Sequence, residues 1–73
     1  MPKLPRIGGR ECIAALQELG FVIVRQRGSY IVMRKGPNGC VVPNHREIRV
    51  GTLAGLLRQA GVDPEEFIKV LKS

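Results

Sequence analysis

The pattern of hydrophobic and polar residues begins with a helical segment. From Arg10 to Leu19, hydrophobic residues recur every three or four positions with polar residues between them, which is typical of an amphipathic helix. Gly20 follows the last hydrophobic residue, in the position where a left-handed glycine ends many helices. The sequence therefore predicts a first helix that ends at Gly20, with residues 1–8 as an extended lead-in.

Residues 20–45 then consist of three short runs rich in β-branched and aromatic side chains, each closed by glycine, proline or asparagine. This pattern predicts an antiparallel meander of three strands. We expect the first turn at Arg27-Gly28, because glycine tolerates the positive φ of a tight hairpin. The second turn is expected at residues 36–39, Gly-Pro-Asn-Gly, with proline at the second position of the turn.

Helical periodicity returns after a polar connection over residues 46–50. The second helix is expected to start near Gly51-Thr52 and to stop at Gly61. The clearest local signal follows at residues 63–66, Asp-Pro-Glu-Glu, since aspartate is a good N-cap, proline fits the first helical position, and acidic residues suit the positive end of the helix dipole. A short third helix is predicted from this cap.

The predicted fold is a single α+β domain, residues 1–73, with the element order α-β-β-β-α-α. Helices pack on one face of the three-stranded sheet, which leaves the other face or an edge for a partner. A chain this short buries only about 60–65% of its unfolded surface, so it has room for one modest core and no large cavity. We expect that core to combine residues from the sheet and all three helices: Leu16, Leu19, Phe21, Leu53, Leu56, Leu57, Phe67 and Leu71.

Charge is spread unevenly along the chain. The formal net charge is +6, and residues 25–49 contain six cationic side chains with Glu47 as the single acidic one. This imbalance favours an anionic partner, with a solvated basic face as the simpler alternative.

The two cysteines, Cys12 and Cys40, lie in a predicted helix and a predicted strand, without the spacing of a zinc site. We expect both to be buried, reduced thiols. The sequence also lacks a run of about 20 apolar residues that would span a membrane, and residues 1–6 lack the apolar stretch of a signal peptide. These features predict a cytoplasmic protein.

Four segments taken together resemble the HicA family of toxins from bacterial toxin–antitoxin pairs. They are Gly20-Phe21, residues 25–29 (Arg-Gln-Arg-Gly-Ser), residues 42–45 (Val-Pro-Asn-His) and residues 51–53 (Gly-Thr-Leu). The resemblance runs from about Gly9 to Leu71. It implies a fold like that of double-stranded-RNA-binding domains, cleavage of mRNA without a metal ion or cofactor, and neutralisation by a HicB-like antitoxin.

Tyr30 departs from the family pattern, because the family places a catalytic histidine at this position, directly after the Gly-Ser of the first hairpin. Histidine suits RNA cleavage, since an imidazole with an unperturbed pKa of about 6.5 exchanges a proton readily near neutral pH. A phenol, with an unperturbed pKa of about 10, does not do so as a base. Three explanations for Tyr30 remain open. The chain is a natural family member with altered catalytic chemistry, a descendant that only binds RNA, or a toxin in which the histidine was replaced to remove its activity.

The resemblance and the charge pattern together select the candidate site residues. Tyr30 occupies the catalytic position, and its simplest alternative role is cross-strand packing. Ser29 offers a hydroxyl near the hairpin, and His45, the single histidine, either contacts phosphate or is a hydrogen-bonded loop residue. The residues expected to bind RNA are Arg25, Arg27, Gly28, Ser29, Arg34, Lys35, His45 and Arg46.

Three functions remain open on the sequence alone. The first is an RNA-cleaving toxin, weakened or inactivated in this chain by Tyr30. The second is an RNA-binding module without catalysis, and the third is a protein-interaction partner whose basic face meets an acidic antitoxin surface. Of these three functions, we favour the toxin.

Overall fold

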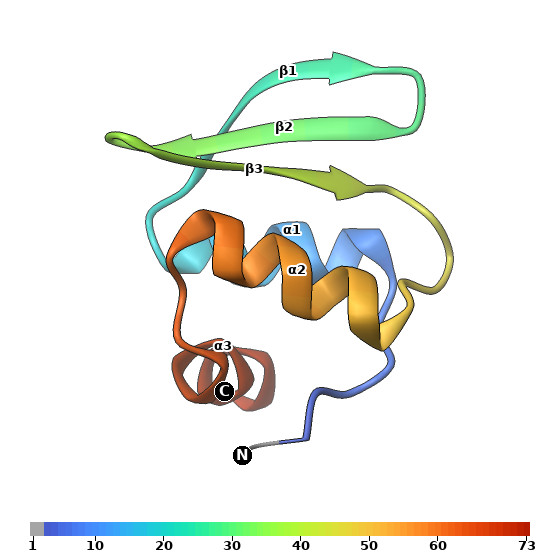
Figure 1. Ribbon diagram of the computed structural model, residues 1–73, viewed down its shortest axis with the longest axis vertical. Helices are drawn as coiled ribbons and strands as arrows, with labels where there is room; N and C mark the ends of the chain where they lie inside the picture. The colour runs from blue at the N-terminus through green and yellow to red at the C-terminus, as the bar shows by residue number, and fades with distance from the viewer. Residues whose placement is uncertain (1–2) are drawn as a thin grey trace.

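A computed structural model describes residues 3–73 as a three-stranded antiparallel sheet with three helices on one side (Figure 1). The elements follow the chain as α1 (Gly9–Glu18), β1 (Val22–Arg27), β2 (Tyr30–Lys35), β3 (Asn38–Pro43), α2 (Val50–Ala60) and α3 (Pro64–Lys72). The predicted α+β class and the order α-β-β-β-α-α are thus confirmed. No helix in residues 3–73 is long and apolar enough to cross a membrane.

The strands lie in the order β1-β2-β3, joined by two tight turns. Arg27 pairs with Tyr30 and Lys35 pairs with Asn38, so the turns are Gly28-Ser29 and Gly36-Pro37. Each predicted turn was wrong by one residue, in opposite directions. The reason is that a right-twisted hairpin favours a turn whose first central residue has positive φ, and Gly28 (φ 56°) and Gly36 (φ 59°) take that place.

The core lies between the helices and the inner face of β2 and β3. Ile31 and Met33 of β2 are buried and pair with Val42 and Cys40 of β3, which are buried as well. Residues paired across an antiparallel ladder share a face, so these four side chains form the floor on which the helices pack. The expected core residues that are buried against this floor are Leu16, Phe21, Leu53, Leu56, Leu57 and Phe67. Leu19 and Leu71 pack against this core at its margin and are only partly buried.

The lead-in and the polar connection meet in the structure, which the sequence pattern did not indicate. Ile48 donates its backbone N–H to the carbonyl of Ile7 at 2.7 Å, and the two side chains are only 2% and 7% exposed. Residues 46–50 are therefore not a wholly polar connection, because Ile48 belongs to the core. The helix that follows begins at Val50, one residue before its expected start.

The helix ends agree with the local signals in the sequence. Gly20 (φ 101°) and Gly61 (φ 71°) are left-handed residues after α1 and α2. Asp63 caps α3 by accepting the N–H of Glu65 at 2.9 Å. At the start of α1 the Glu11 carboxylate accepts the N–H of Gly8 at 3.2 Å, which supplies part of the cap that glycine lacks.

β1 is the least covered element of the molecule. All of its residues are exposed, and it makes its extensive contacts with β2 alone, whereas α1 and α2 pack against β3. Figure 1 shows the same arrangement, with β1 at the top, farthest from the helices. β1 therefore lies at the margin of the helical layer, and its side chains are available to a partner.

Candidate nucleic-acid interface

The face of the sheet opposite the helices carries three arginines and an exposed tyrosine. Because Ile31 and Met33 point into the core, Tyr30, Val32 and Arg34 point the other way. The register then places Arg27 beside Tyr30 and Arg25 beside Val32 on this outer face.

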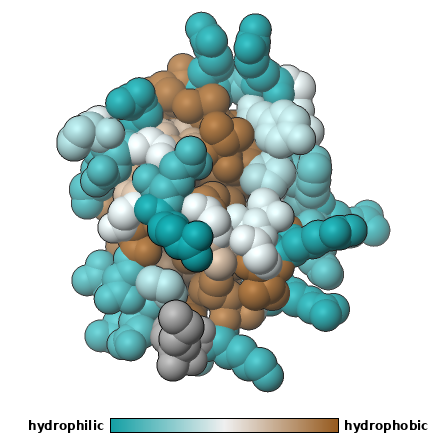
Figure 2. Space-filling view, in the orientation of Figure 1, coloured by the Kyte–Doolittle hydropathy of each residue, from teal (hydrophilic) through white to brown (hydrophobic). Residues whose placement is uncertain are grey.

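The outer face has an apolar middle, with arginines on its β1 side and farther along β2. Val32 lies between Arg25 on one side and Val41, which is 41% exposed, on the other. Arg34 lies next along β2, and its side chain extends over Gly39, where no side chain occupies the space. Hydrophobic side chains are also visible at the surface over the strands in the upper part of Figure 2, with hydrophilic side chains around them. Exposed apolar surface rimmed by arginine is a common composition for a binding surface.

One end of this face brings together Ser29, Tyr30 and His45. The Ser29 hydroxyl lies 3.4 Å from Nε2 of His45, and the ring centroids of Tyr30 and His45 are 6.3 Å apart at an interplanar angle of 59°. All three side chains are exposed, with Tyr30 at 52%. The sequence predicted each of these residues as a site residue, and the structure places them in one cluster.

His45 reaches this cluster because the loop after β3 is fixed from two sides. Asn44 donates its N–H to the carbonyl of Ser29 at 2.6 Å, and Gly9 donates its N–H to the carbonyl of His45 at 2.8 Å. A Cβ on Gly9 would lie 2.5 Å from Cα of Asn44, and a Cβ on Gly8 would lie 2.5 Å from the carbonyl oxygen of Arg46. Glycines at the start of α1 therefore allow the helix to approach the loop closely enough to hold it.

A shallow groove of about 270 Å³ adjoins the cluster. Its lining includes Tyr30 and His45 together with Glu47, Arg49 and Thr52 from the β3–α2 loop and the start of α2. Arg49 and Thr52 were not among the predicted site residues. The available signal for Thr52 was Gly51-Thr52-Leu53, which formed part of the family resemblance without being assigned a role, and for Arg49 it was the run of cations over residues 25–49.

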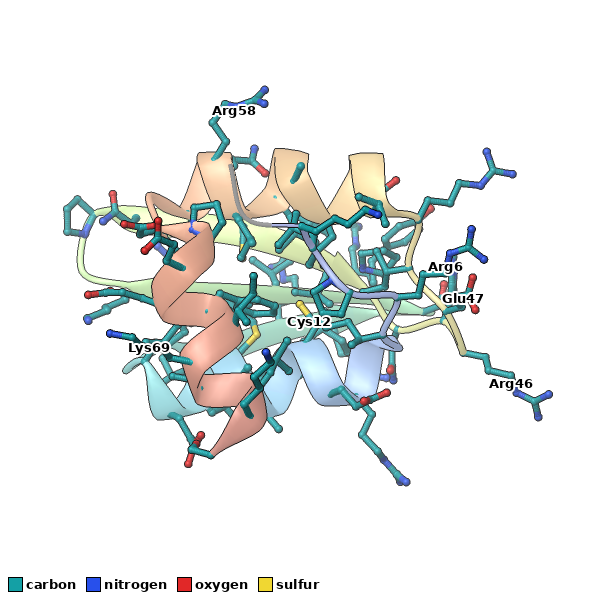
Figure 3. The ribbon with its side chains drawn as sticks, turned by 90° about the horizontal axis from the view of Figure 1, so that it is seen from below. Arg6, Cys12, Arg46, Glu47, Arg58 and Lys69 are labelled. Carbon is teal, nitrogen blue, oxygen red and sulfur yellow. The ribbon has the colours of Figure 1, made fainter. Side chains whose placement is uncertain are left out.

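Two of the predicted RNA-binding residues lie apart from both this cluster and the outer face. Lys35 donates from Nζ to the carbonyl of Leu19 at 2.7 Å, so it lies at the carboxyl end of α1, where a cation suits the helix dipole. Arg46 is exposed on the β3–α2 loop, and its side chain points away from the body of the protein (Figure 3). Whether either side chain contacts RNA stays a prediction.

The cysteines are remote from this chemistry. Cys12 and Cys40 are free and buried, as expected, and Cys12 lies inside the molecule in Figure 3. Burial raises the pKa of Cys12 to about 12, with a smaller contribution from the charge of Cys40, and burial also raises the pKa of Cys40. Both thiols thus stay protonated at neutral pH, so they serve as core residues and not as nucleophiles.

The chemistry available at the hairpin end is proton transfer and phosphate binding. The Ser29 hydroxyl lies 3.4 Å from the imidazole of His45, and the ring centroids of His45 and Tyr30 are 6.3 Å apart. Arginine side chains follow on the adjoining strand. Guanidinium groups bind phosphate oxygens, and an imidazole accepts or donates a proton near neutral pH. This combination suits the breaking of a phosphodiester bond.

Comparison with known proteins gives one family match. Residues 9–62, more than half of the chain, match the family model described as HicA toxin of bacterial toxin-antitoxin. The comparison with curated proteins found no match. The matched range runs from the start of α1 to the second residue after α2, and it contains the outer face of the sheet and the Ser29, Tyr30 and His45 cluster.

Proposed function

The chain belongs to the HicA family, the toxins of bacterial toxin–antitoxin systems, and on that premise we propose that it is an endoribonuclease of a type II pair. In this proposal it cleaves mRNA without a metal ion, in the cytoplasm, and so inhibits translation. A HicB-like antitoxin neutralises it. The observation that carries the proposal is the cluster of Ser29, Tyr30 and His45 beside the arginine-bearing outer face.

RNA is proposed to lie along the outer face of the first hairpin. Arg25 and Arg27 are successive outward residues of β1, so they are spaced to contact neighbouring phosphates of a single strand. The exposed ring of Tyr30 gives a surface on which a base can stack, an interaction worth about 1–3 kcal/mol in other proteins. A strand held in this way passes over Ser29 and His45.

The antitoxin is proposed to cover the same surface. Val22, Val24 and Val41 are 58%, 52% and 41% exposed and lie among the arginines, a composition that suits an apolar partner surface with acidic residues at its rim. Such a partner would exclude RNA by occupying its phosphate contacts. The interaction function therefore accompanies the toxin function and does not compete with it.

Cleavage of a short single-stranded RNA tests the proposed function. The unaltered chain and Tyr30→His are incubated with the RNA in the presence of a chelator, and the products are resolved by size. We expect cleavage that needs no metal and that is substantially faster with Tyr30→His, because a matched acid or base contributes about 10²–10⁴ in rate.

Two other outcomes would change this proposal. Binding of RNA by both proteins without cleavage by either would favour the non-catalytic RNA-binding module. Equal rates for the two proteins would show that position 30 is not catalytic here, although the protein cleaves RNA.

A further inference from the structure

His45 lies beside Tyr30 at the hairpin end of the outer face, and its imidazole is exposed. Histidine occurs once in the sequence, and the family resemblance assigns catalysis to position 30, where this chain has tyrosine. The fold nevertheless brings the imidazole of His45 next to that position, with ring centroids 6.3 Å apart. We propose that His45 is the general base of this chain and that it replaces the missing histidine at position 30. The inference rests on the proposed ribonuclease function.

The backbone of His45 is fixed while its ring remains available. Its N–H donates to the carbonyl of Pro43 at 2.8 Å, and its carbonyl accepts the N–H of Gly9 at 2.8 Å. The ring makes only a long contact, 3.4 Å from Nε2 to the Ser29 hydroxyl, in an exposed position. The ring is therefore accessible to a bound RNA strand. Here the loop holds the Cα in place and leaves Nε2 facing the hairpin.

The surroundings of the ring suit a reacting phosphodiester. The ring lines the groove of about 270 Å³ together with Tyr30, Glu47, Arg49 and Thr52. Arg49 lines the same groove, so it places a cation beside the position where a phosphate would lie. The groove is open and shallow, so a single strand can enter without a rearrangement of the fold.

The proposed step uses the RNA, two side chains of this protein and solvent water. Nε2 of His45 takes the proton of the ribose 2′-hydroxyl, and the 2′-oxygen attacks the adjacent phosphorus. The bond from phosphorus to the 5′-oxygen of the next nucleotide breaks, and that oxygen receives the proton of the Tyr30 hydroxyl. The products are a 2′,3′-cyclic phosphate and a 5′-hydroxyl. Solvent then carries the proton from the imidazolium back to the phenolate.

The test compares the unaltered chain with His45→Gln on a fluorescent single-stranded RNA in the presence of a chelator. We expect His45→Gln to lower the cleavage rate by about 10²–10⁴, with RNA affinity changed by less than about twofold, because glutamine keeps a polar side chain without a titratable proton. Arg58→Gln, prepared in the same way, is the control, since Arg58 is exposed on α2 away from the hairpin (Figure 3). It should cut at the unaltered rate.

Chemical rescue separates a base from a residue that only shapes the loop. In His45→Gly the ring is absent and its exposed position is open to solvent. Added imidazole should therefore restore cleavage at least tenfold in His45→Gly and leave Arg58→Gln unchanged. An RNA with a 2′-O-methyl group at the cleaved nucleotide should not be cut by any of these proteins.

Each remaining outcome overturns the inference and has its own consequence for the proposed function. If the unaltered chain and His45→Gln cut equally fast, His45 is not the base, and the ribonuclease function stands. If only Tyr30→His cuts, the site is catalytic in the family manner and His45 does not replace the lost histidine. If none of the proteins cuts although all bind RNA, the inference and the ribonuclease function fail together, and RNA binding remains.

Discussion

β1 and β3 are the two edge strands of the same sheet, and they have opposite environments. Each has six residues and pairs with β2. Cys40 and Val42 of β3 are buried under the helices, whereas every residue of β1 is exposed. The difference arises because α1 and α2 pack against β3 and make no comparable contact with β1.

This asymmetry separates stability from recognition. The free energy of folding comes mainly from the β3 side, where the apolar surface of the sheet and the helices is removed from water. The β1 side carries arginines and exposed valines that contribute little to folding and are available for RNA or an antitoxin. Substitutions on the two sides should therefore have different effects on stability and on binding.

The largest loss of stability is expected from a substitution in the helices that pack against β3. Leu56 is 5% exposed, and Leu56→Ala should lower the free energy of unfolding by about 2–5 kcal/mol, because it removes buried methyl groups and leaves a cavity. Thermal and urea unfolding followed by circular dichroism measure the change. Gln59→Ala, at an exposed position of the same helix, is the control and should stay within about 0.5 kcal/mol. A Leu56→Ala protein that melts at the unaltered temperature would contradict the burial of this side chain in the core.

An identical substitution on the two edge strands compares them directly. Val42 of β3 is 0% exposed and Val24 of β1 is 52% exposed. Val42→Ala should cost about 2 kcal/mol of unfolding free energy, from the lost burial of apolar surface, and Val24→Ala about 0.5 kcal/mol or less. Urea unfolding of both variants gives the two values. Equal losses would mean that β1 contributes to the core as much as β3 does.

The smallest effect on stability and the clearest effect on binding are expected from the arginines of β1. If two to four charges neutralise phosphates, the logarithm of RNA affinity should fall with the logarithm of salt concentration at a slope of roughly −1.5 to −3. Alanine at both Arg25 and Arg27 should flatten this slope, with little change in melting temperature because both are exposed. Fluorescence anisotropy with a labelled single-stranded RNA measures it. An unchanged slope in the double variant would place the RNA on another surface.

Local signals in the sequence determined which elements form and where most of them end. Asp63-Pro64 capped α3, Gly20 and Gly61 ended α1 and α2, and glycines produced both hairpin turns. These signals act within a few residues of the chain, so they can be read without knowledge of the fold. The turn positions were wrong by one residue, because strand twist and not the turn residues alone selects which glycine takes the positive φ.

Tertiary structure alone decided which segments meet. No pattern in the sequence indicates that Ile7 pairs with Ile48, that Lys35 caps the carboxyl end of α1, or that the loop after β3 is held against Gly9. These contacts depend on how the helices cross the sheet, which a short hydrophobic pattern does not encode.

The site depends on tertiary structure in the same way. The sequence identified Tyr30 and His45 as separate candidates 15 positions apart. Their ring centroids are 6.3 Å apart because β2 pairs with β3. That pairing places Pro43 opposite Tyr30, and His45 follows two residues later.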